Sequence, residues 1–165
     1  MGKIGDILSL LPYRYVATTT VVFTFVLMLL GAYTSAIGAG LSCPDWPKCY
    51  GVWIPFLHPE IMADAPYSST QIFAEWAHRG LASIVGVMII GTVASAWATH
   101  RNRRSITWSA TLALLILPVQ VVMGGLTVTQ LLEPFIVTSH LGLAILVLVC
   151  LVVSTISAWF VEIDH

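Results

Sequence analysis

The stretch EWAHRGLASIVGVMIIG, residues 75–91, places three ionisable side chains at the head of a long apolar run. A helix needs roughly 20 mainly apolar residues to cross a membrane. Four stretches of the chain satisfy this length, and residues 75–91 lie in the second of them. The predicted spans are residues 16–41, 71–99, 106–131 and 133–160.

The composition agrees with a membrane protein. Hydrophobic residues make up 58% of the chain and charged residues only 9%, which is too little charge to cover the surface of a soluble domain. The four spans use most of the chain, so we predict that residues 1–165 form one all-α domain, a transmembrane four-helix bundle. We expect membrane lipid around it and no nucleic acid among its partners.

Positive charge predicts the orientation in the membrane. Lys3 and Arg14 precede the first span, and the HRNRRS loop with its three arginines joins the second span to the third. By the positive-inside rule, both termini are cytoplasmic and the long loop at residues 42–70 is outside. We expect a multi-pass protein of a prokaryotic plasma membrane. We interpret residues 1–15 as an interfacial segment and the first span as a helix rather than a signal peptide, whose apolar region is only about 7–15 residues long.

The long loop contains two cysteines in the segment CPDWPKC, Cys43 and Cys49. In an oxidising compartment two cysteines this close can form a disulfide, and the prolines between them bend the chain in favour of it. The bridge is either a staple of the loop or a labile, redox-active pair. A zinc site needs about four ligands, which this loop does not offer. Cys150, deep in the fourth span, is interpreted as a small buried apolar residue.

The chain contains an internal repeat. The second and fourth spans carry HRGLASIV from residue 78 and HLGLAILV from residue 140. The first and third spans share a weaker echo, LLGAYTSAIG against VMGGLTVTQL, which aligns Thr34 with Thr127. The matching segments therefore predict that the four helices are two copies of a helical hairpin, which enter the membrane in the same direction. Such repeats are usually related by a pseudo-twofold axis along the membrane normal.

The repeat places two histidines, His78 and His140, at equal depth. Each lies about seven residues inside its span, which at 1.5 Å per residue is on the order of 10 Å below the outer surface. Facing imidazoles in a four-helix bundle are a common way to hold haem, with both axial positions of the iron filled. Gly31, Gly124 and Gly125 leave space on the other two helices. The alternative is two buried histidines that are hydrogen-bonded across helices.

Only the first copy carries a carboxylate beside its histidine. Glu75 precedes His78 by three residues, whereas Val137 occupies that place before His140. A buried carboxylate costs several kcal/mol unless it is paired or protonated. Glu75 is therefore either paired structurally, with Arg79 or a helix N-terminus, or acts at the porphyrin edge by stabilising positive charge or moving a proton. Arg79 suits either the haem propionates or lipid headgroups.

Four segments of the chain closely resemble the N-terminal half of haem A synthase. They are GAYTSAIGAGLSCPDWPKCYG, EWAHRGLA, GGLTV and PFIVTSHLGLA, and they lie within residues 30–144. The usual member of that family has eight membrane helices in two similar halves. The family oxidises the C8 methyl of haem O to a formyl group and so supplies haem A to terminal oxidases.

The resemblance implies roles for individual residues. His78 and His140 correspond to axial ligands of the substrate haem, Glu75 to the acidic residue implicated in oxidation, and Cys43 and Cys49 to a cysteine pair of the outer loop. In the family, the C-terminal half holds a haem b cofactor. The resemblance therefore implies haem as ligand, haem O as substrate, and haem O synthase as a partner.

This sequence departs from the family because it has no second half, so we expect homo-oligomers in which several bundles share the work. A haem with both axial positions filled also has no open position for oxygen, so oxidation must withdraw electrons from the macrocycle or displace one ligand. Three other functions stay open. They are a non-catalytic bis-histidine haem b electron carrier, a haem carrier or assembly factor, and a membrane scaffold without metal.

Overall fold

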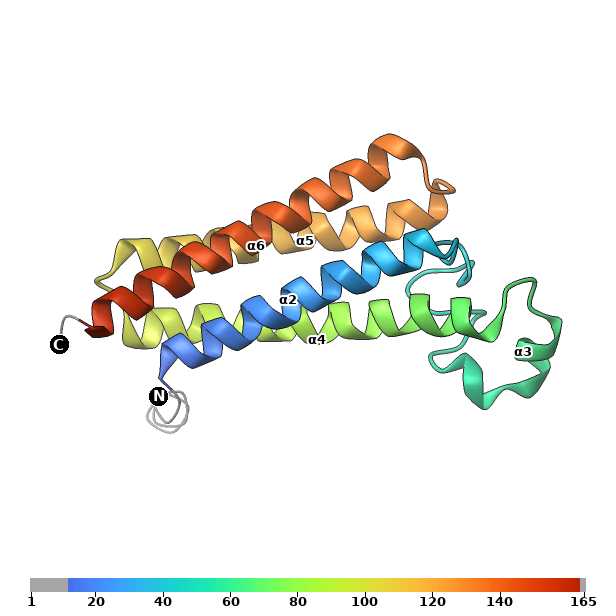
Figure 1. Ribbon diagram of the computed structural model, residues 1–165, viewed down its shortest axis with the longest axis horizontal. Coiled ribbons are helices and arrows are strands. Elements are labelled where there is room, and N and C mark those ends of the chain that lie inside the picture. The colour runs from blue at the N-terminus through green and yellow to red at the C-terminus, as the bar shows by residue number, and fades with distance from the viewer. Residues whose placement is uncertain (1–11, 164–165) are drawn as a thin grey trace.

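The computed structural model describes residues 12–163, and the architecture over this range is a bundle of long helices (Figure 1). Four helices are long and apolar enough to cross a membrane: α2 (Tyr13–Ala36), α4 (Ser69–Thr99), α5 (Arg104–Thr129) and α6 (Pro134–Ile163). The loop between α2 and α4, here called the Cys loop (residues 37–68), carries the short helices η1 (Pro55–Leu57) and α3 (Pro59–Asp64). The predicted all-α fold class is confirmed, whereas the side of the membrane on which each end lies stays a prediction.

The first helix differs from its predicted range. We expected residues 16–41, but α2 begins at Tyr13 and ends at Ala36. It ends early because Gly38 adopts a left-handed φ of +67° and closes a Schellman motif. In this motif the N–H of Gly38 donates to the carbonyl of Ser35 over 3.1 Å, and the N–H of Ala39 donates to that of Thr34 over 2.8 Å. Most of the predicted interfacial segment at residues 1–15 lies outside the described residues.

The third long helix ends in the same way. The N–H of Leu131 donates to the carbonyl of Val128 over 3.1 Å, and the N–H of Leu132 donates to that of Thr127 over 2.8 Å. This is again a Schellman motif, and it falls at the position that the repeat aligns with Gly38. Here the left-handed residue is a leucine, Leu131, with a φ of +50°.

The remaining boundaries lie close to prediction. α4 begins at Ser69 because Ser68 and Gln71 form a capping box, in which each side chain accepts a hydrogen bond from the backbone N–H of the other. α5 and α6 begin and end within about three residues of the predicted spans. Four predicted spans have thus become four helices of the expected order.

The helices form a ring in which α2 contacts α4 and α6, and α5 contacts α4 and α6. The helices α4 and α6 therefore lie on one diagonal of the bundle, and α2 and α5 on the other. The hairpin pairs are α2 with α4 and α5 with α6, as the repeat predicts. In Figure 1, α4 and α6 diverge toward the end of the bundle that carries the Cys loop, here called the loop end.

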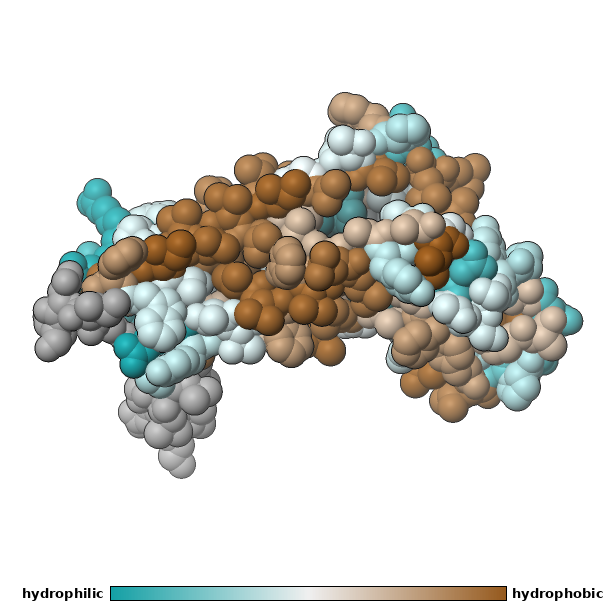
Figure 2. Space-filling view, viewed as in Figure 1, coloured by the Kyte–Doolittle hydropathy of each residue, from teal (hydrophilic) through white to brown (hydrophobic). Residues whose placement is uncertain are grey.

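The opposite end of the bundle, near the α4–α5 connection, is tightly closed. Small buried residues line it, and a buried chain of hydrogen bonds crosses it: Tyr13 Oη contacts Ser154 Oγ at 2.5 Å, and Ser154 Oγ donates to the Ile106 carbonyl over 2.8 Å. Thr20 and Thr92 join α2 to α4 with a hydroxyl contact of 2.8 Å. The buried alanines of this end are Ala17, Ala96, Ala110 and Ala158. Large apolar side chains cover the outside of the helices, as a lipid-facing surface requires (Figure 2).

The two Schellman motifs make a prediction about stability. Leu131 is 76% exposed, so its replacement loses little packing, and its left-handed backbone conformation costs a leucine about 1 kcal/mol that glycine does not incur. We expect Leu131→Gly to raise the free energy of unfolding by about 1 kcal/mol and Gly38→Ala to lower it by a similar amount. Unfolding curves in mixed micelles, followed by circular dichroism, would measure both. A loss of stability in Leu131→Gly would contradict the assignment of the cap.

Candidate functional site

The two histidines lie on diagonally opposed helices, and each packs against a glycine of the neighbouring helix. A Cβ built on Gly31 of α2 would lie 2.8 Å from Cε1 of His78 on α4. A Cβ built on Gly124 of α5 would lie 3.2 Å from Cε1 of His140 on α6. Any larger side chain would displace the imidazole, so the glycines are required for the close approach. The space that we expected beside these two glycines is occupied by the imidazole rings.

The surroundings of the two histidines follow the internal repeat. Gly31 and Gly124 are aligned with each other, and so are Thr34 and Thr127. Thr34 Oγ1 donates to the Gly31 carbonyl over 3.1 Å, and Thr127 Oγ1 donates to the Gly124 carbonyl over 2.7 Å. The repeated pattern of the sequence is therefore also a repeated local structure.

The ring nitrogens of both histidines have capacity to bind a ligand. Nδ1 of His78 and Nδ1 of His140 are both buried and have no hydrogen-bond partner among the described residues. The alternative of histidines hydrogen-bonded across helices is not seen at these two atoms. It is supported elsewhere on the rings, because the backbone of Leu27 on α2 bonds His78 and the backbone of Gln120 on α5 bonds His140. Two neutral imidazoles on a bundle diagonal suit a metal whose remaining ligands come from elsewhere.

A porphyrin meets this requirement because it supplies its own four equatorial nitrogens. Within residues 12–163, no group of three or more His, Cys, Asp or Glu side chains is placed to hold a bare metal ion. The donor set, the unpartnered Nδ1 atoms and the glycine at each ring therefore fit a haem held by two histidines better than a free ion.

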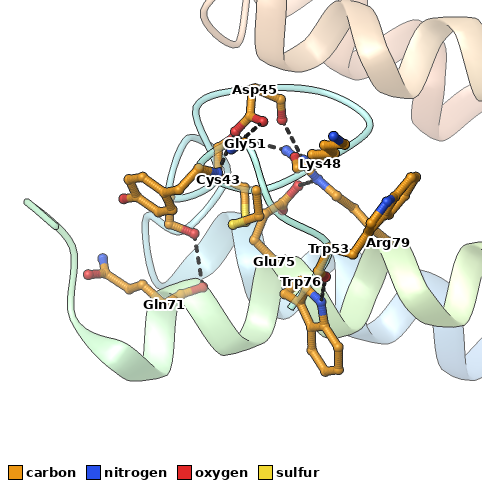
Figure 3. Close-up of a disulfide and its surroundings, with 12 residues drawn as sticks. Cys43, Asp45, Lys48, Gly51, Trp53, Gln71, Glu75, Trp76 and Arg79 are labelled. Atoms are coloured by element: carbon orange, nitrogen blue, oxygen red, sulfur yellow. Dashed lines mark hydrogen bonds and ion pairs between the residues drawn. A yellow bond between two sulfur atoms is a disulfide. The ribbon is translucent and has the colours of Figure 1, made fainter. Parts of the chain in front are cut away.

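Glu75 and Arg79 form a buried ion pair one turn apart on α4, beside His78. Arg79 Nε donates to Glu75 Oε1 over 2.8 Å, and the two side chains are only 14% and 9% exposed. This confirms Arg79 as the structural partner that we considered for the carboxylate. The remaining bonds of Arg79 were not anticipated: its Nη1 and Nη2 atoms donate to carbonyl groups of the Cys loop (Figure 3). The expected roles of Arg79 toward propionates or lipid headgroups stay predictions.

The cysteine pair forms a buried disulfide. Cys43 and Cys49 are bonded, and their exposed fractions are 0% and 2%. They pack with Ile72 of α4 and with aromatic residues of the loop. A thiol-reactive enzyme or reductant would have to unpack the loop to reach the sulfur atoms, so the structure favours the loop staple over a labile pair. Cys150 is free and only partly buried, at the edge of the apolar cluster between the helices.

Two further residues lie near the site. The indole of Trp46 lies over Gly125 of α5, with its Cδ2 3.2 Å from the position that a Cβ would take. Gln120, one turn before Gly124, has a buried Oε1 atom without a hydrogen-bond partner. Trp46 is still 45% exposed, and composition alone does not show that one tryptophan of the loop packs on α5.

Four helices long and apolar enough to cross a membrane, with an imidazole packed on a glycine in each hairpin, place the described residues in the class of all-α integral membrane bundles. Within this class, the chain belongs to the COX15-CtaA family of cytochrome oxidase assembly proteins, whose family model matches residues 14–162. The resemblance seen in the sequence is thereby confirmed. No solved structure matches the chain significantly.

Individual relatives carry two different names. A heme A synthase of Shewanella oneidensis is 33% identical over 74% of this chain and 38% of its own length. A heme A synthase of Geobacillus thermodenitrificans is 25% identical over 90% of this chain and 44% of its own length. A protoheme IX farnesyltransferase of Halobacterium salinarum is 33% identical over 84% of this chain and 28% of its own length. The chain thus spans less than half the length of these curated relatives.

The glycine contacts predict a graded loss of stability. Gly31→Ala places a methyl group 2.8 Å from the His78 ring and should lower the free energy of unfolding by about 1–3 kcal/mol, as overpacking does. Gly124→Ala should lower the free energy of unfolding by less, because its Cβ would lie 3.2 Å from the His140 ring. Gly91→Ala is the matched control, because nothing lies within 4 Å of its Cβ position. Equal stability of Gly31→Ala and Gly91→Ala in mixed-micelle unfolding would show that His78 does not pack on Gly31.

Proposed function

We propose that this chain binds haem between His78 and His140 and acts as a haem A synthase, oxidising the C8 methyl of haem O to a formyl group. The observation that carries the proposal is the repeated pair of imidazoles, each packed on a glycine with its Nδ1 unpartnered. Membership of the COX15-CtaA family and the similarity to heme A synthases support the choice of reaction.

In this proposal the protein holds and orients the substrate. His78 and His140 would hold the haem iron, one from each of the two diagonal helices α4 and α6. When bound, the haem supplies a conjugated ring that can release electrons. Conversion of the methyl to a formyl group takes its oxygen atom from water and releases four protons and four electrons, so an electron acceptor outside this chain is required.

Glu75 is the group that we propose to act on the reacting edge. Its carboxylate lies one turn from His78 and is 9% exposed at the side chain, where a charge acts more strongly than it does in water. A negative charge held there stabilises positive charge that develops on the substrate. The ion pair with Arg79 keeps the carboxylate in place without the cost of an unpaired buried charge.

A second candidate function is a haem carrier or electron-transfer protein with the same two ligands. One observation favours it: Arg79 binds Glu75 and the Cys loop together, which explains a carboxylate at this position without any chemistry. The two candidates agree on haem binding and differ on whether the haem is altered.

One experiment separates the candidates. The protein is produced in cells that supply haem O, and the bound haem is extracted and identified by chromatography and mass spectrometry. We expect haem A or its hydroxylated intermediate from the unchanged chain, unmodified haem O from Glu75→Gln, and a strong loss of bound haem from His78→Ala and from His140→Ala. His58→Ala is the matched control, because His58 is an exposed residue of the loop that pairs with Glu60.

The results have distinct meanings. Unmodified haem in both the unchanged chain and Glu75→Gln would favour the carrier. Oxidised haem in Glu75→Gln at the level of the unchanged chain would remove Glu75 from the chemistry. Full haem content in His78→Ala would overturn the proposed ligands.

We also propose that the working protein is an assembly. The chain covers 38% and 44% of two heme A synthases, so a second copy of this bundle is a reasonable source of what their remaining length provides. A similar domain lies within a protein named for the farnesylation of protohaem. Haem O synthase, the enzyme class that performs that reaction and makes haem O, is therefore the proposed neighbouring partner.

The assembly proposal predicts a dependence on concentration. In mild detergent we expect native mass spectrometry to find two or more chains in a complex, and turnover per chain to fall when the sample is diluted, because dilution dissociates the copies. A monomer whose turnover per chain is unchanged at high dilution would contradict homo-oligomerisation. Native mass spectra of the chain co-expressed with a haem O synthase test the second partner, because a complex would appear at the summed mass of the two proteins.

A further inference from the structure

Arg79 holds a closed ring of seven residues against α4. The disulfide between Cys43 and Cys49 closes this ring, and three of its carbonyl groups converge on one guanidinium. Nη1 donates to the carbonyls of Asp45 over 2.6 Å and Lys48 over 2.7 Å, and Nη2 donates to that of Cys43 over 2.9 Å. With the bond to Glu75, four of the five N–H groups of the arginine are used.

The ring is also braced from within the loop. Asp45 accepts hydrogen bonds from the backbone N–H of Tyr50 over 2.6 Å and of Gly51 over 2.9 Å. Just before the ring, Ser42 Oγ donates to the Gln71 carbonyl at the start of α4 over 2.9 Å. Figure 3 shows these groups gathered over one face of α4. The ring is therefore a rigid body fixed to α4 rather than a loose connection.

The other side of the ring reaches the second hairpin. Trp46, at the middle of the ring, lies over Gly125 of α5, and Gly125 is the neighbour of Gly124, against which His140 packs. Gly40, just before the ring, lies against Leu132 in the α5–α6 turn, with Cδ2 of the leucine 3.1 Å from its Cβ position. The loop thus contacts the hairpin of His140 at two points.

The positions of these contacts matter because α4 and α6 diverge toward the loop end (Figure 1). Of the four neighbouring helix pairs, α4 and α5 pack least extensively. The buried small residues and the buried Tyr13–Ser154 hydrogen bond that join the hairpins directly lie at the opposite end. Near the histidines, the Cys loop is therefore a principal connection between α4 and α5.

We propose that the disulfide ring is a strut that sets the separation of the two histidine-bearing helices, with Arg79 as its anchor on α4 and Trp46 as its contact on α5. Arg79 is then a positioning residue that acts through the loop. The strut itself follows from the contacts alone, and only its consequence for haem ligation rests on the proposed function.

Arg79→Lys tests the anchor because it keeps the positive charge. A lysine presents its donors at one point and cannot span three carbonyls and a carboxylate, whereas it would still serve a propionate or a lipid headgroup. The matched control is Arg101→Lys, the same change in the opposite connection. Trp46→Ala tests the contact on α5 while leaving every hydrogen bond of Arg79 in place, and Trp53→Ala, an exposed tryptophan of the same loop, is its control.

The measurement is a distance in the haem-free protein. Spin labels are attached through Ile84→Cys on α4 and Ile145→Cys on α6 in a Cys150→Ala background, with the disulfide kept oxidised. Both label positions are about half exposed, at 54% and 46%. Double electron–electron resonance then reports the separation of the diagonal helices, without any dependence on haem or on turnover.

We expect Arg79→Lys and Trp46→Ala each to widen the distance distribution and shift its mean, and both controls to leave it unchanged. An unchanged distribution in either Arg79→Lys or Trp46→Ala would overturn the strut, and so would equal widening in the controls. If Arg79→Lys fails to fold, Trp46→Ala decides the question alone.

A second measurement links the strut to ligation. In haem-loaded protein, electron paramagnetic resonance of the ferric haem reports the axial ligands and their orientation. We expect Arg79→Lys to broaden this signal while the bound haem keeps two histidine ligands. A distance distribution that broadens in Arg79→Lys, together with no bound haem in the unchanged chain, would support the strut and count against the proposed function. The two failures are therefore distinguishable.

Discussion

The hydrocarbon region of a bilayer contains no water to satisfy polar groups, and this constraint organises the whole bundle. Buried hydroxyls pair with one another or with a carbonyl one turn away, as Tyr13 does with Ser154 and Thr20 with Thr92. The buried ion pair of Glu75 with Arg79 is completed by hydrogen bonds from Arg79 to carbonyl groups of the Cys loop. Among the described residues, Nδ1 of His78 and Nδ1 of His140 belong to a small group of buried polar atoms without a hydrogen-bond partner, which also includes Ser95 Oγ and Gln120 Oε1.

Sequence reasoning succeeded where the signal is local and periodic. Span length, the order of helices, the hairpin repeat and the equal depth of the two histidines all follow from apolar runs and from matching segments. The end of α2 was placed five residues too late because hydropathy continues past Ala36, whereas the chain turns at Gly38. The partners of Arg79 were not predictable, because three of them are backbone carbonyls, which every residue has and which only the folded loop brings together.

The repeat is most informative where its two copies differ. Leu141 and Val137 occupy the places of Arg79 and Glu75 in the second copy, so both members of the ion pair are missing there together. The second copy also joins its helices by a short turn at residues 130–133, whereas the first carries the Cys loop. The ion pair therefore occurs only in the copy that has the long loop, whereas the histidine and its glycine occur in both copies.

This division bears on what Glu75 is for. A buried ion pair is seldom more stable than well-packed apolar side chains of the same volume, so stability alone does not explain its presence. Val137 and Leu141 show that the fold accepts apolar residues at the equivalent positions. Anchoring the loop explains Arg79 fully, and a carboxylate is the group that neutralises it. Because the same carboxylate lies one turn from His78, the chemistry that we propose for the haem edge would need no second acidic residue.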